Sequence, residues 1–486
     1  MIGKALKVNL AYAIGSATNS AALFLLVPYL VNALTPGEYG AWSLLEIGIL
    51  LLSCFLLAGL DVGLMREYWL LDGEKERARL AGTALIAAVV WGVLLTGLLG
   101  AALFVGRWHW DFPGAPYTLG LALGIGLLEA VFALLLTIFR IREKALTFVA
   151  LSVGRLVSVL GLSIGLVQAG GGIAGALAGR LLASTLSLGV AVVLGRHYLV
   201  LKLDWARLRR MARYGLPLLP ANLASYVLFA SDRYVLQYFS TLEVVGIYTF
   251  AYKVATTLDV LITRPFALDW APRRFKIAAQ ADAPHKYAQV LLIYLYGGAL
   301  FSLVVLAATP TVYVWIAPAR YWEGMRVVPV ILAAYLIYGL SYPLNVGIML
   351  KDQTRYLPLI GWLAAGVCLA LNLWLIPNYG MLGAAWATLI AYGVWTGAIT
   401  WVSLRLYPIA YPGRSILWCV LGTFLAYLWI WETGRLWGTS GALSPLLVRL
   451  GGILLIFTGI GYMLWGRWIW PQVLGSNKKT ITGSEE

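Results

Sequence analysis

The chain is poor in charge for its length of 486 residues. Only 12% of its residues are charged, while 61% are hydrophobic and the mean hydropathy is +0.82. Soluble domains carry about 25% charged residues, so this composition excludes an ordinary soluble fold and favours a membrane protein. The formal charge of +15 does not indicate a nucleic-acid partner, because the Lys and Arg are spread over short loops.

The residues and motifs of catalytic and metal sites are also scarce. The three cysteines, Cys54, Cys368 and Cys419, lie in separate apolar segments without a CxxC pair, which excludes a disulfide framework and a zinc site. The three histidines fall in predicted loops, and the chain has no GxxxxGK[ST] or HExxH motif. We therefore expect no metal, no cofactor and no enzymatic activity.

Long apolar runs fill the chain instead. A bilayer span needs about 20 apolar residues, and on this basis we expect about fourteen transmembrane helices. The first run follows Lys4 and Lys7 and lacks a small-residue cleavage site, so we interpret it as an uncleaved span. The predicted spans are 8–34, 38–64, 81–106, 117–139, 146–168, 172–195, 215–239, 244–270, 289–316, 326–350, 357–377, 380–404, 416–433 and 446–466.

The basic residues between these spans orient the chain. With the N-terminus inside, most of the 36 Lys and Arg fall in inner segments. The predicted outer segments hold only Arg107, Arg320, Arg326, Arg435 and Arg449. Because positive residues stay on the cytoplasmic side, both termini are expected there.

Two pairs of segments indicate an internal repeat. The segment from Thr35 to Trp42 resembles that from Thr241 to Tyr248, and Gly172-Ile173-Ala174-Gly175 resembles Gly380-Met381-Leu382-Gly383. Each pair lies six spans apart, so the repeats share one orientation and predict two six-helix lobes related by a pseudo-two-fold axis along the membrane normal. The expected organisation is a first lobe at 1–195, a linker at 196–214, a second lobe at 215–406, two additional helices at 407–466 and a tail at 467–486.

Charged residues inside the predicted spans are the candidate functional residues. A cation at the bilayer centre costs about 2.5–3.5 kcal/mol, so embedded cations indicate a function, and here a negatively charged substrate in a cavity between the lobes. The embedded cations are Arg155, Arg180, Arg233, Lys253 and Arg264, and the embedded acids are Glu46, Glu129, Asp232 and Asp259. Lys253 and Arg264 are expected to share one face of a helix.

Each of these residues also has a structural interpretation. Asp232 and Arg233 either form a structural ion pair or contact substrate, and Arg155 and Arg264 either contact substrate or snorkel to the inner interface. Arg180 alternatively joins helix packing. The acids Glu46 and Glu129 are either proton or sodium sites or partners of the arginines. Lys253 is the hardest to explain structurally.

Several short motifs, by their order and spacing along this chain, carry a family resemblance. They are Val27-Pro28-Tyr29-Leu30, Thr35-Pro36-Gly37-Glu38-Tyr39-Gly40, Gly59-Leu60-Asp61, Arg66-Glu67-Tyr68, Tyr214-Gly215-Leu216-Pro217-Leu218-Leu219-Pro220, Ser231-Asp232-Arg233-Tyr234, Gly246-Ile247-Tyr248 and Trp270-Ala271-Pro272. Together they resemble the Wzx-type flippases of O-antigen and exopolysaccharide units, within the multidrug/oligosaccharidyl-lipid/polysaccharide exporter superfamily. The resemblance covers most of the chain to about residue 400.

The resemblance implies an all-α polytopic membrane protein that moves undecaprenyl-pyrophosphate-linked oligosaccharide from the inner to the outer leaflet by alternating access. It implies a cationic central cavity, in which Arg233 is the cation that a family motif supports. We expect an inner-membrane monomer that contacts membrane lipids, a polysaccharide polymerase and a chain-length regulator, and no nucleic acid. The alternatives are a lipid II flippase, a multidrug extruder of the same superfamily, and a glycan polymerase or ligase. Short predicted outer loops count against the last of these.

Overall fold

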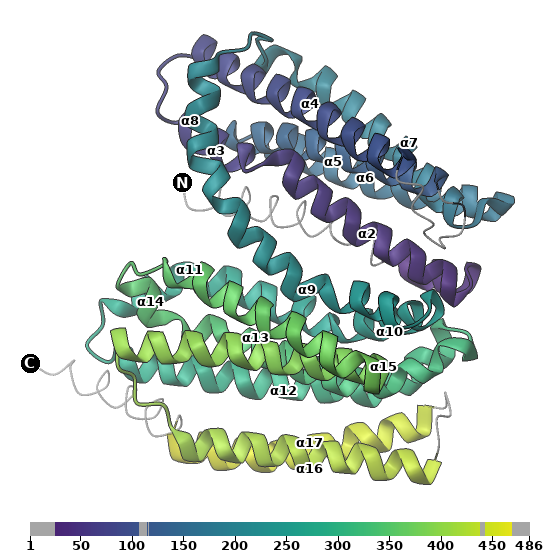
Figure 1. The fold of residues 1–486 in the computed structure, drawn as a ribbon. Coiled ribbons are helices and arrows are strands. Elements are labelled where there is room, and N and C mark those ends of the chain that lie inside the picture. The colour runs from purple at the N-terminus through teal and green to yellow at the C-terminus, as the bar shows by residue number, and fades with distance from the viewer. Residues whose placement is uncertain (1–24, 106–113, 115, 438–442, 469–486) are drawn as a thin grey trace, which may run out of the picture. The chain divides into compact units, whose positions relative to one another are not determined.

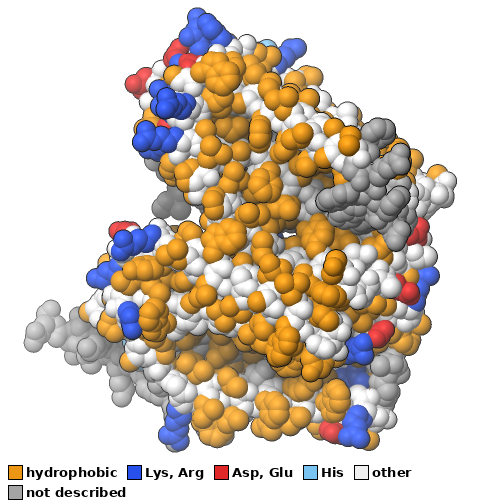
Figure 2. Space-filling view, in the orientation of Figure 1, with side chains coloured by type: hydrophobic (Ala, Val, Ile, Leu, Met, Phe, Trp, Pro, Cys, Tyr) orange, Lys and Arg blue, Asp and Glu red, His pale blue; other side chains and the backbone are white. Residues whose placement is uncertain are grey.

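The computed structural model describes residues 25–105, 114, 116–437 and 443–468. Over these residues the secondary structure is helical, without a strand, which confirms the predicted all-α class. Within this described part of the chain, ten helices are long and apolar enough to cross a membrane. In Figure 2, hydrophobic side chains cover most of the surface shown of each unit, as expected of helices that face lipid.

The chain divides into two compact units, and unit 1 comprises Met1–Thr249. Its helices α4 to α7 run side by side, and α8 lies across the bundle near α3 (Figure 1). The helices of unit 1 are α2 (Pro36–Leu57), α3 (Leu60–Tyr68), α4 (Glu74–Val105), α5 (Tyr117–Ile141), α6 (Ala145–Leu166), α7 (Gly172–Gly195), α8 (Trp205–Gly215), α9 (Leu219–Phe239) and the first part of α10 (Leu242–Ala255). A core of Leu, Ile and Phe from α3, α4 and α5 holds this bundle together.

Unit 2 comprises Phe250–Glu486. Figure 1 shows α12, α13 and α15 running side by side, with α16 and α17 paired along α12. Its elements are the end of α10, a π-helical turn at Asp259–Thr263, α11 (Arg264–Ala278), α12 (Ala283–Ile316), α13 (Val328–Leu344), α14 (Val346–Leu350), α15 (Tyr356–Leu406), α16 (Gly413–Trp437) and α17 (Leu443–Trp468). A 3-10 helix at Ala319–Val327 joins α12 to α13.

The predicted spans agree with these helices at most positions. The pair 146–168 and 172–195 corresponds to α6 and α7, which are separated at Gly170 and Gly172. The pair 357–377 and 380–404 corresponds to the two parts of α15, which bends at Gly380. The first span, 8–34, lies mostly outside the described residues, so the count of fourteen stays a prediction.

The two glycine bends have the same backbone conformation. Gly172 has φ 51° and ψ −139°, and Gly380, its counterpart in the predicted repeat, has φ 52° and ψ −129°. Positive φ favours glycine. Three residues later, a Cβ on Gly175 would lie 2.8 Å from the carbonyl oxygen of Leu166, and one on Gly383 would lie 2.4 Å from that of Leu375. The sequence repeat is therefore a structural repeat at this turn.

The other repeated segment contacts its own counterpart within unit 1. A Cβ on Gly40 would lie 2.0 Å from the carbonyl oxygen of Leu242, and one on Gly246 would lie 1.9 Å from that of Pro36. The Ser43 hydroxyl lies 3.1 Å from that of Thr249. Equivalent residues that contact each other reciprocally are the mark of a local two-fold relation between the two segments.

Three features differ from the sequence expectation. The predicted span 38–64 is interrupted, because Ala58 and Gly59 adopt positive φ where the Gly59 backbone approaches that of Gly215. The linker 196–214 contains the unpredicted helix α8, which Asp204 caps. The π-helical turn between Lys253 and Arg264 has more residues per turn than an α-helix, so the α-helical face expected for these two residues does not apply.

Candidate functional site

Four of the embedded charged residues form one cluster inside unit 1. They come from four helices: Glu46 from α2, Glu129 from α5, Arg155 from α6 and Arg180 from α7. The Arg180 Nε and Nη2 atoms donate to the two carboxylate oxygens of Glu129 at 2.7 and 2.9 Å. This bidentate arrangement is the strongest that an arginine makes with a carboxylate.

Both arginines share the same carboxylate. Arg155 Nη2 lies 2.5 Å from Glu129 Oε1, and Arg180 Nη1 also donates to Glu46. Each of the four side chains is at most 13% exposed. Because two cations face two anions, the cluster has no net formal charge, which reduces the cost of holding these ions in an apolar bundle.

A second group of interacting polar side chains links α9 to α10 within unit 1. Arg233 donates from Nη1 to the Asp232 carboxylate at 3.2 Å and to the Phe229 carbonyl at 2.9 Å. The Tyr248 hydroxyl donates to the other Asp232 oxygen at 2.6 Å, and its ring centre lies 5.8 Å from the guanidinium carbon. Asp232 and Arg233 are 2% and 3% exposed, so this group is fully inside the protein.

Tyr248 was not among the candidates from the sequence. The sequence nevertheless pointed to this residue, because Tyr248 ends the Gly246-Ile247-Tyr248 motif, which belongs to both the repeat and the family resemblance. The buried hydroxyl supplies a donor that the Asp232 carboxylate needs away from water.

The third group lies in unit 2 around the π-helical turn. Arg264 Nε donates to Asp259 at 2.8 Å, and the Arg264 side chain is 58% exposed whereas that of Asp259 is 12% exposed. In the same turn, the hydroxyls of Thr263 and Tyr294 lie 2.7 Å apart. Lys253 is half-buried one helix earlier, in α10.

The structure thus brings the nine candidates together only in part. It joins Glu46, Glu129, Arg155 and Arg180, it pairs Asp232 with Arg233, and it pairs Asp259 with Arg264. All four arginines already hold carboxylates, and among them Arg264 has the most exposed side chain. The assignment of these residues to a substrate stays a prediction.

Comparison with known proteins identifies the family. A family model described as "Polysaccharide biosynthesis protein" matches residues 7–277, which is more than half of the chain. The chain belongs to this polysaccharide biosynthesis protein family. The match confirms the resemblance that the sequence motifs indicate. A search of curated proteins finds no match.

Solved transporter structures have the same fold as this member of the polysaccharide biosynthesis protein family. One is a lipid II flippase, MurJ, in an inward closed conformation, with a TM-score of 0.76 at 11% identity over 93% of this chain and 99% of that one. Another is an inward-facing multidrug transporter of the MATE family and the MOP superfamily, with a TM-score of 0.56 at 14% identity over 81% of this chain and 94% of that one. A third is the Vibrio cholerae MATE transporter VcmN in its bent form, with a TM-score of 0.51 at 14% identity over 83% and 98%. At these identities the likeness shows the fold alone.

Proposed function

We propose that the chain is a flippase that moves an undecaprenyl-pyrophosphate-linked oligosaccharide from the inner to the outer leaflet of the cytoplasmic membrane by alternating access. The observation that carries the proposal is that seven of the nine candidate charged residues, all but Asp232 and Arg233 of α9, lie in helices apolar enough to cross a membrane, in a member of the polysaccharide biosynthesis family. Charge within a span is costly and marks a pathway for a charged substrate. A lipid-linked pyrophosphate is such a substrate, because its head is anionic and its tail is apolar.

The embedded cations receive the pyrophosphate in this proposal. A guanidinium offers five N–H donors in a planar fork that suits phosphate oxygens. Arg264 is the best placed of the four arginines by accessibility, because 58% of its side chain is exposed although its Nε atom pairs with Asp259. Arg233, Lys253, Arg155 and Arg180 supply further positive charge along the path.

The four embedded acids act as charge partners or as ion-coupling groups. Each acid lies within hydrogen-bonding distance of an arginine, as the pairs show for Glu46, Glu129, Asp232 and Asp259. The sequence alone left this pairing as one of two alternatives. An arriving phosphate competes with a carboxylate for the same guanidinium, so uptake of a proton or a metal cation by the carboxylate favours the substrate-bound state. Translocation is therefore coupled to an ion gradient or to the membrane potential.

The surroundings follow from the same proposal. The protein is a monomer in the inner membrane with both termini in the cytoplasm, it contacts membrane lipids, and it works beside a polysaccharide polymerase and a chain-length regulator. It needs no cofactor, and it acts as a transporter without an enzymatic step.

The test is reconstitution of the purified protein in sealed vesicles with one of three cargoes. They are a pyrophosphate-linked oligosaccharide, lipid II and a cationic drug, each followed by its accessibility to an external enzyme or by fluorescence. We expect only the lipid-linked oligosaccharide to cross rapidly, and an imposed proton or sodium gradient to change its rate. Transport of lipid II alone, or of the drug alone, contradicts the proposal.

A further inference from the structure

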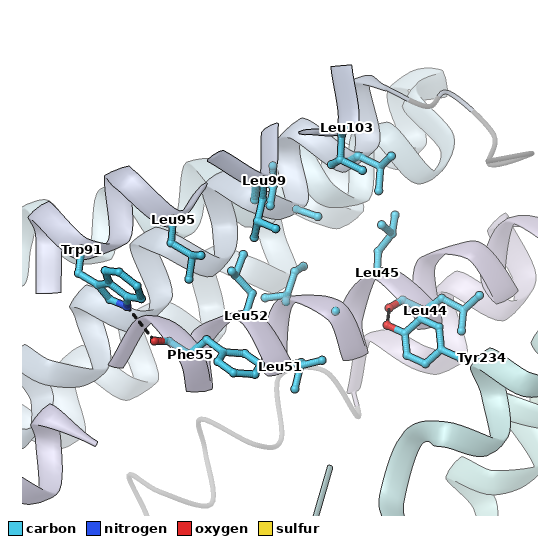
Figure 3. Close-up of a pocket in the computed structure, with 15 residues that line it drawn as sticks. Leu44, Leu45, Leu51, Leu52, Phe55, Trp91, Leu95, Leu99, Leu103 and Tyr234 are labelled. Carbon is cyan, nitrogen blue, oxygen red and sulfur yellow. Dashed lines mark hydrogen bonds between the residues drawn. The ribbon is translucent and has the colours of Figure 1, made fainter. Parts of the chain in front are cut away.

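Unit 1 offers the bilayer two kinds of surface, and the first is apolar. A groove of about 500 Å³ lies between α2, α4 and α5 and is lined mostly by leucines (Figure 3). Its two polar side chains, Tyr234 and Trp91, donate to the backbone carbonyls of Leu44 and Phe55. Such a surface contacts any hydrocarbon chain alike, so it does not select one lipid from another.

The second surface is helix α8, whose start is held at the membrane boundary. Arg79 is the last charged residue of α4 before an apolar run that begins at Leu80. One turn further on, the Thr83 hydroxyl donates to the Lys202 carbonyl at 2.9 Å and accepts from the backbone N–H of Asp204, the N-cap of α8, at 3.3 Å. Thr83 is about 6 Å beyond Arg79 along the helix axis. Helix α8 therefore begins level with the first apolar turn of α4.

The segment before α8 lies on the lipid-facing side of α4. Val90 and Leu94 of α4 are 53% and 62% exposed, as expected of aliphatic side chains that contact lipid. They follow Thr83 by seven and eleven residues, two and three helical turns, and so share its face of the helix. A Cβ on Gly82 would lie 2.0 Å from the Val200 carbonyl oxygen, which shows how directly the segment packs on α4. The start of α8 is therefore next to lipid.

Two of the four arginines of α8 already hold carboxylates. The pairs are Arg207 with Glu76 and Asp204, and Arg210 with Glu67. Arg209 and Arg213 are exposed, and no carboxylate of the described residues lies within ion-pair distance of either. These two guanidiniums therefore keep all their donors for a ligand outside unit 1.

The two unpaired arginines line up with a tryptophan. Trp205, Arg209 and Arg213 follow at intervals of four residues and so form one stripe along α8, away from Met211, which is fully buried. The Cβ atoms of residues four apart on a helix are about 5–6 Å from each other, so both guanidiniums can reach one phosphate. Trp205 is 73% exposed, and tryptophan favours the membrane–water interface.

We propose that this stripe of Trp205, Arg209 and Arg213 binds the head of an anionic phospholipid in the leaflet where α8 lies. The guanidiniums donate to the phosphate, and the indole lies at the boundary between heads and hydrocarbon. A zwitterionic phospholipid carries an ammonium group that the two cations repel, so the stripe selects net negative charge. A soluble acidic protein fits less well, because Trp205 begins level with the apolar part of α4. The proposal concerns membrane lipid and holds for any cargo that the protein carries.

Photolabelling by lipid tests the occupant of the stripe. The full-length protein is placed in phosphatidylcholine vesicles that contain either phosphatidylglycerol or phosphatidylcholine with a photoreactive group near the head, and label on residues 199–216 is measured by mass spectrometry. We expect phosphatidylglycerol to label this segment and the phosphatidylcholine probe to label it little. Equal labelling by the two probes overturns the proposal in favour of unselective lipid contact. Absence of label from both probes also overturns it, since the stripe then faces water and suits a soluble partner.

Removal of the two charges gives the magnitude. Arg209→Gln with Arg213→Gln should lower phosphatidylglycerol labelling of the segment about thirtyfold, because each basic residue near an anionic surface contributes about 1 kcal/mol. Lys276→Gln with Arg414→Gln is the matched control, since it removes two exposed cations of unit 2 and lowers the net charge equally. The control should label as the wild type does. An equal loss in both variants means that overall charge, and not the stripe, attracts the lipid.

A charge-preserving variant separates electrostatic binding from misfolding. Arg209→Lys with Arg213→Lys keeps both cations and should retain most of the labelling, with all variants equally monodisperse. Loss of labelling as complete as in the glutamine variant contradicts an electrostatic site for the lipid head. No cargo is present in these measurements, so their outcome is independent of the proposed flippase function.

Discussion

Removal of the Glu129 carboxylate is the most demanding test of the charge cluster in unit 1. Glu129 accepts two bonds from Arg180 and one from Arg155, so Glu129→Leu leaves two buried guanidiniums facing the single carboxylate of Glu46. Removal of one partner from a buried ion pair costs about 3–5 kcal/mol, because the remaining charge stays away from water without compensation. We therefore expect a loss of stability of this size.

A charge-balanced double variant separates this reasoning from simple loss of packing. Glu129→Leu combined with Arg155→Leu leaves Arg180 paired with Glu46, and replacement of a buried pair by apolar residues is often neutral or stabilising. The double variant should therefore recover most of the stability that the single variant loses. As a surface control, Glu323→Leu breaks the exposed pair with Arg326 and should change stability by no more than about 1 kcal/mol.

The assay is equilibrium unfolding of the three variants in the same lipid–detergent mixture, followed by near-ultraviolet circular dichroism. Two results refute the reasoning. The first is a Glu129→Leu protein as stable as the wild type, and the second is a double variant no more stable than the single one. Either result means that the four residues do not form a mutually compensating cluster in the folded protein.

Three further predictions concern single features of the fold. Trp91→Phe removes the donor to the Phe55 carbonyl and should cost about 1–3 kcal/mol in the same unfolding assay; an unchanged stability argues against that hydrogen bond. Gly40→Ala brings a methyl group against the Leu242 carbonyl and should cost about 1–3 kcal/mol, while Gly97→Ala, with open space around it in α4, should be neutral or slightly stabilising; equal effects contradict the close contact. The pKa of Asp204 lies below its ordinary value, chiefly because its carboxylate accepts a hydrogen bond from the backbone N–H of Arg207. A carboxylate whose pKa is lowered in the folded protein stabilises the fold at pH values above its ordinary pKa, and this stabilisation is lost as the pH falls through the lowered pKa. Hydrogen exchange of α8, corrected for intrinsic rates, should therefore accelerate at acid pH. Asp204→Asn keeps a good cap without titrating, and acceleration of the same size in that variant contradicts the role of Asp204.

Much of the fold was readable from the sequence because a bilayer allows few solutions. Backbone polar groups in hydrocarbon must be paired, so long apolar runs form helices, and glycine marks where those helices bend. Gly172 and Gly380 are examples. Both begin the repeated segment, and both adopt the positive φ that glycine tolerates. The break at Ala58 was not readable, because alanine favours helix, and the neighbouring approach of Gly59 to Gly215 is a contact between residues far apart in the sequence.

The candidate site was predictable as a set of residues and not as an arrangement. Hydropathy alone picks out Glu129, Arg155 and Arg180 as charges within spans. Their pairing depends on how three helices are rotated about their axes, and an apolar helix in lipid gives a weak signal of rotation because all of its faces are hydrophobic. Helix α8 is the opposite case, because its sequence carries helix signals, namely the cap at Asp204 and the helical spacing of Leu208, Met211 and Gly215.

The initial rate of lipid-linked oligosaccharide translocation by Lys253 and Arg233 variants tests the central claim most directly. Lys253→Ala and Arg233→Ala are compared in sealed vesicles with Lys253→Arg, which keeps the charge, and with wild-type protein at equal incorporation. Arg233→Gln in an Asp232→Asn background keeps the local charge balance and separates substrate contact from loss of the ion pair. The account predicts that both alanine variants and the balanced double variant lose translocation, while Lys253→Arg retains most of it. Normal rates in both alanine variants would contradict a cationic path for a lipid pyrophosphate.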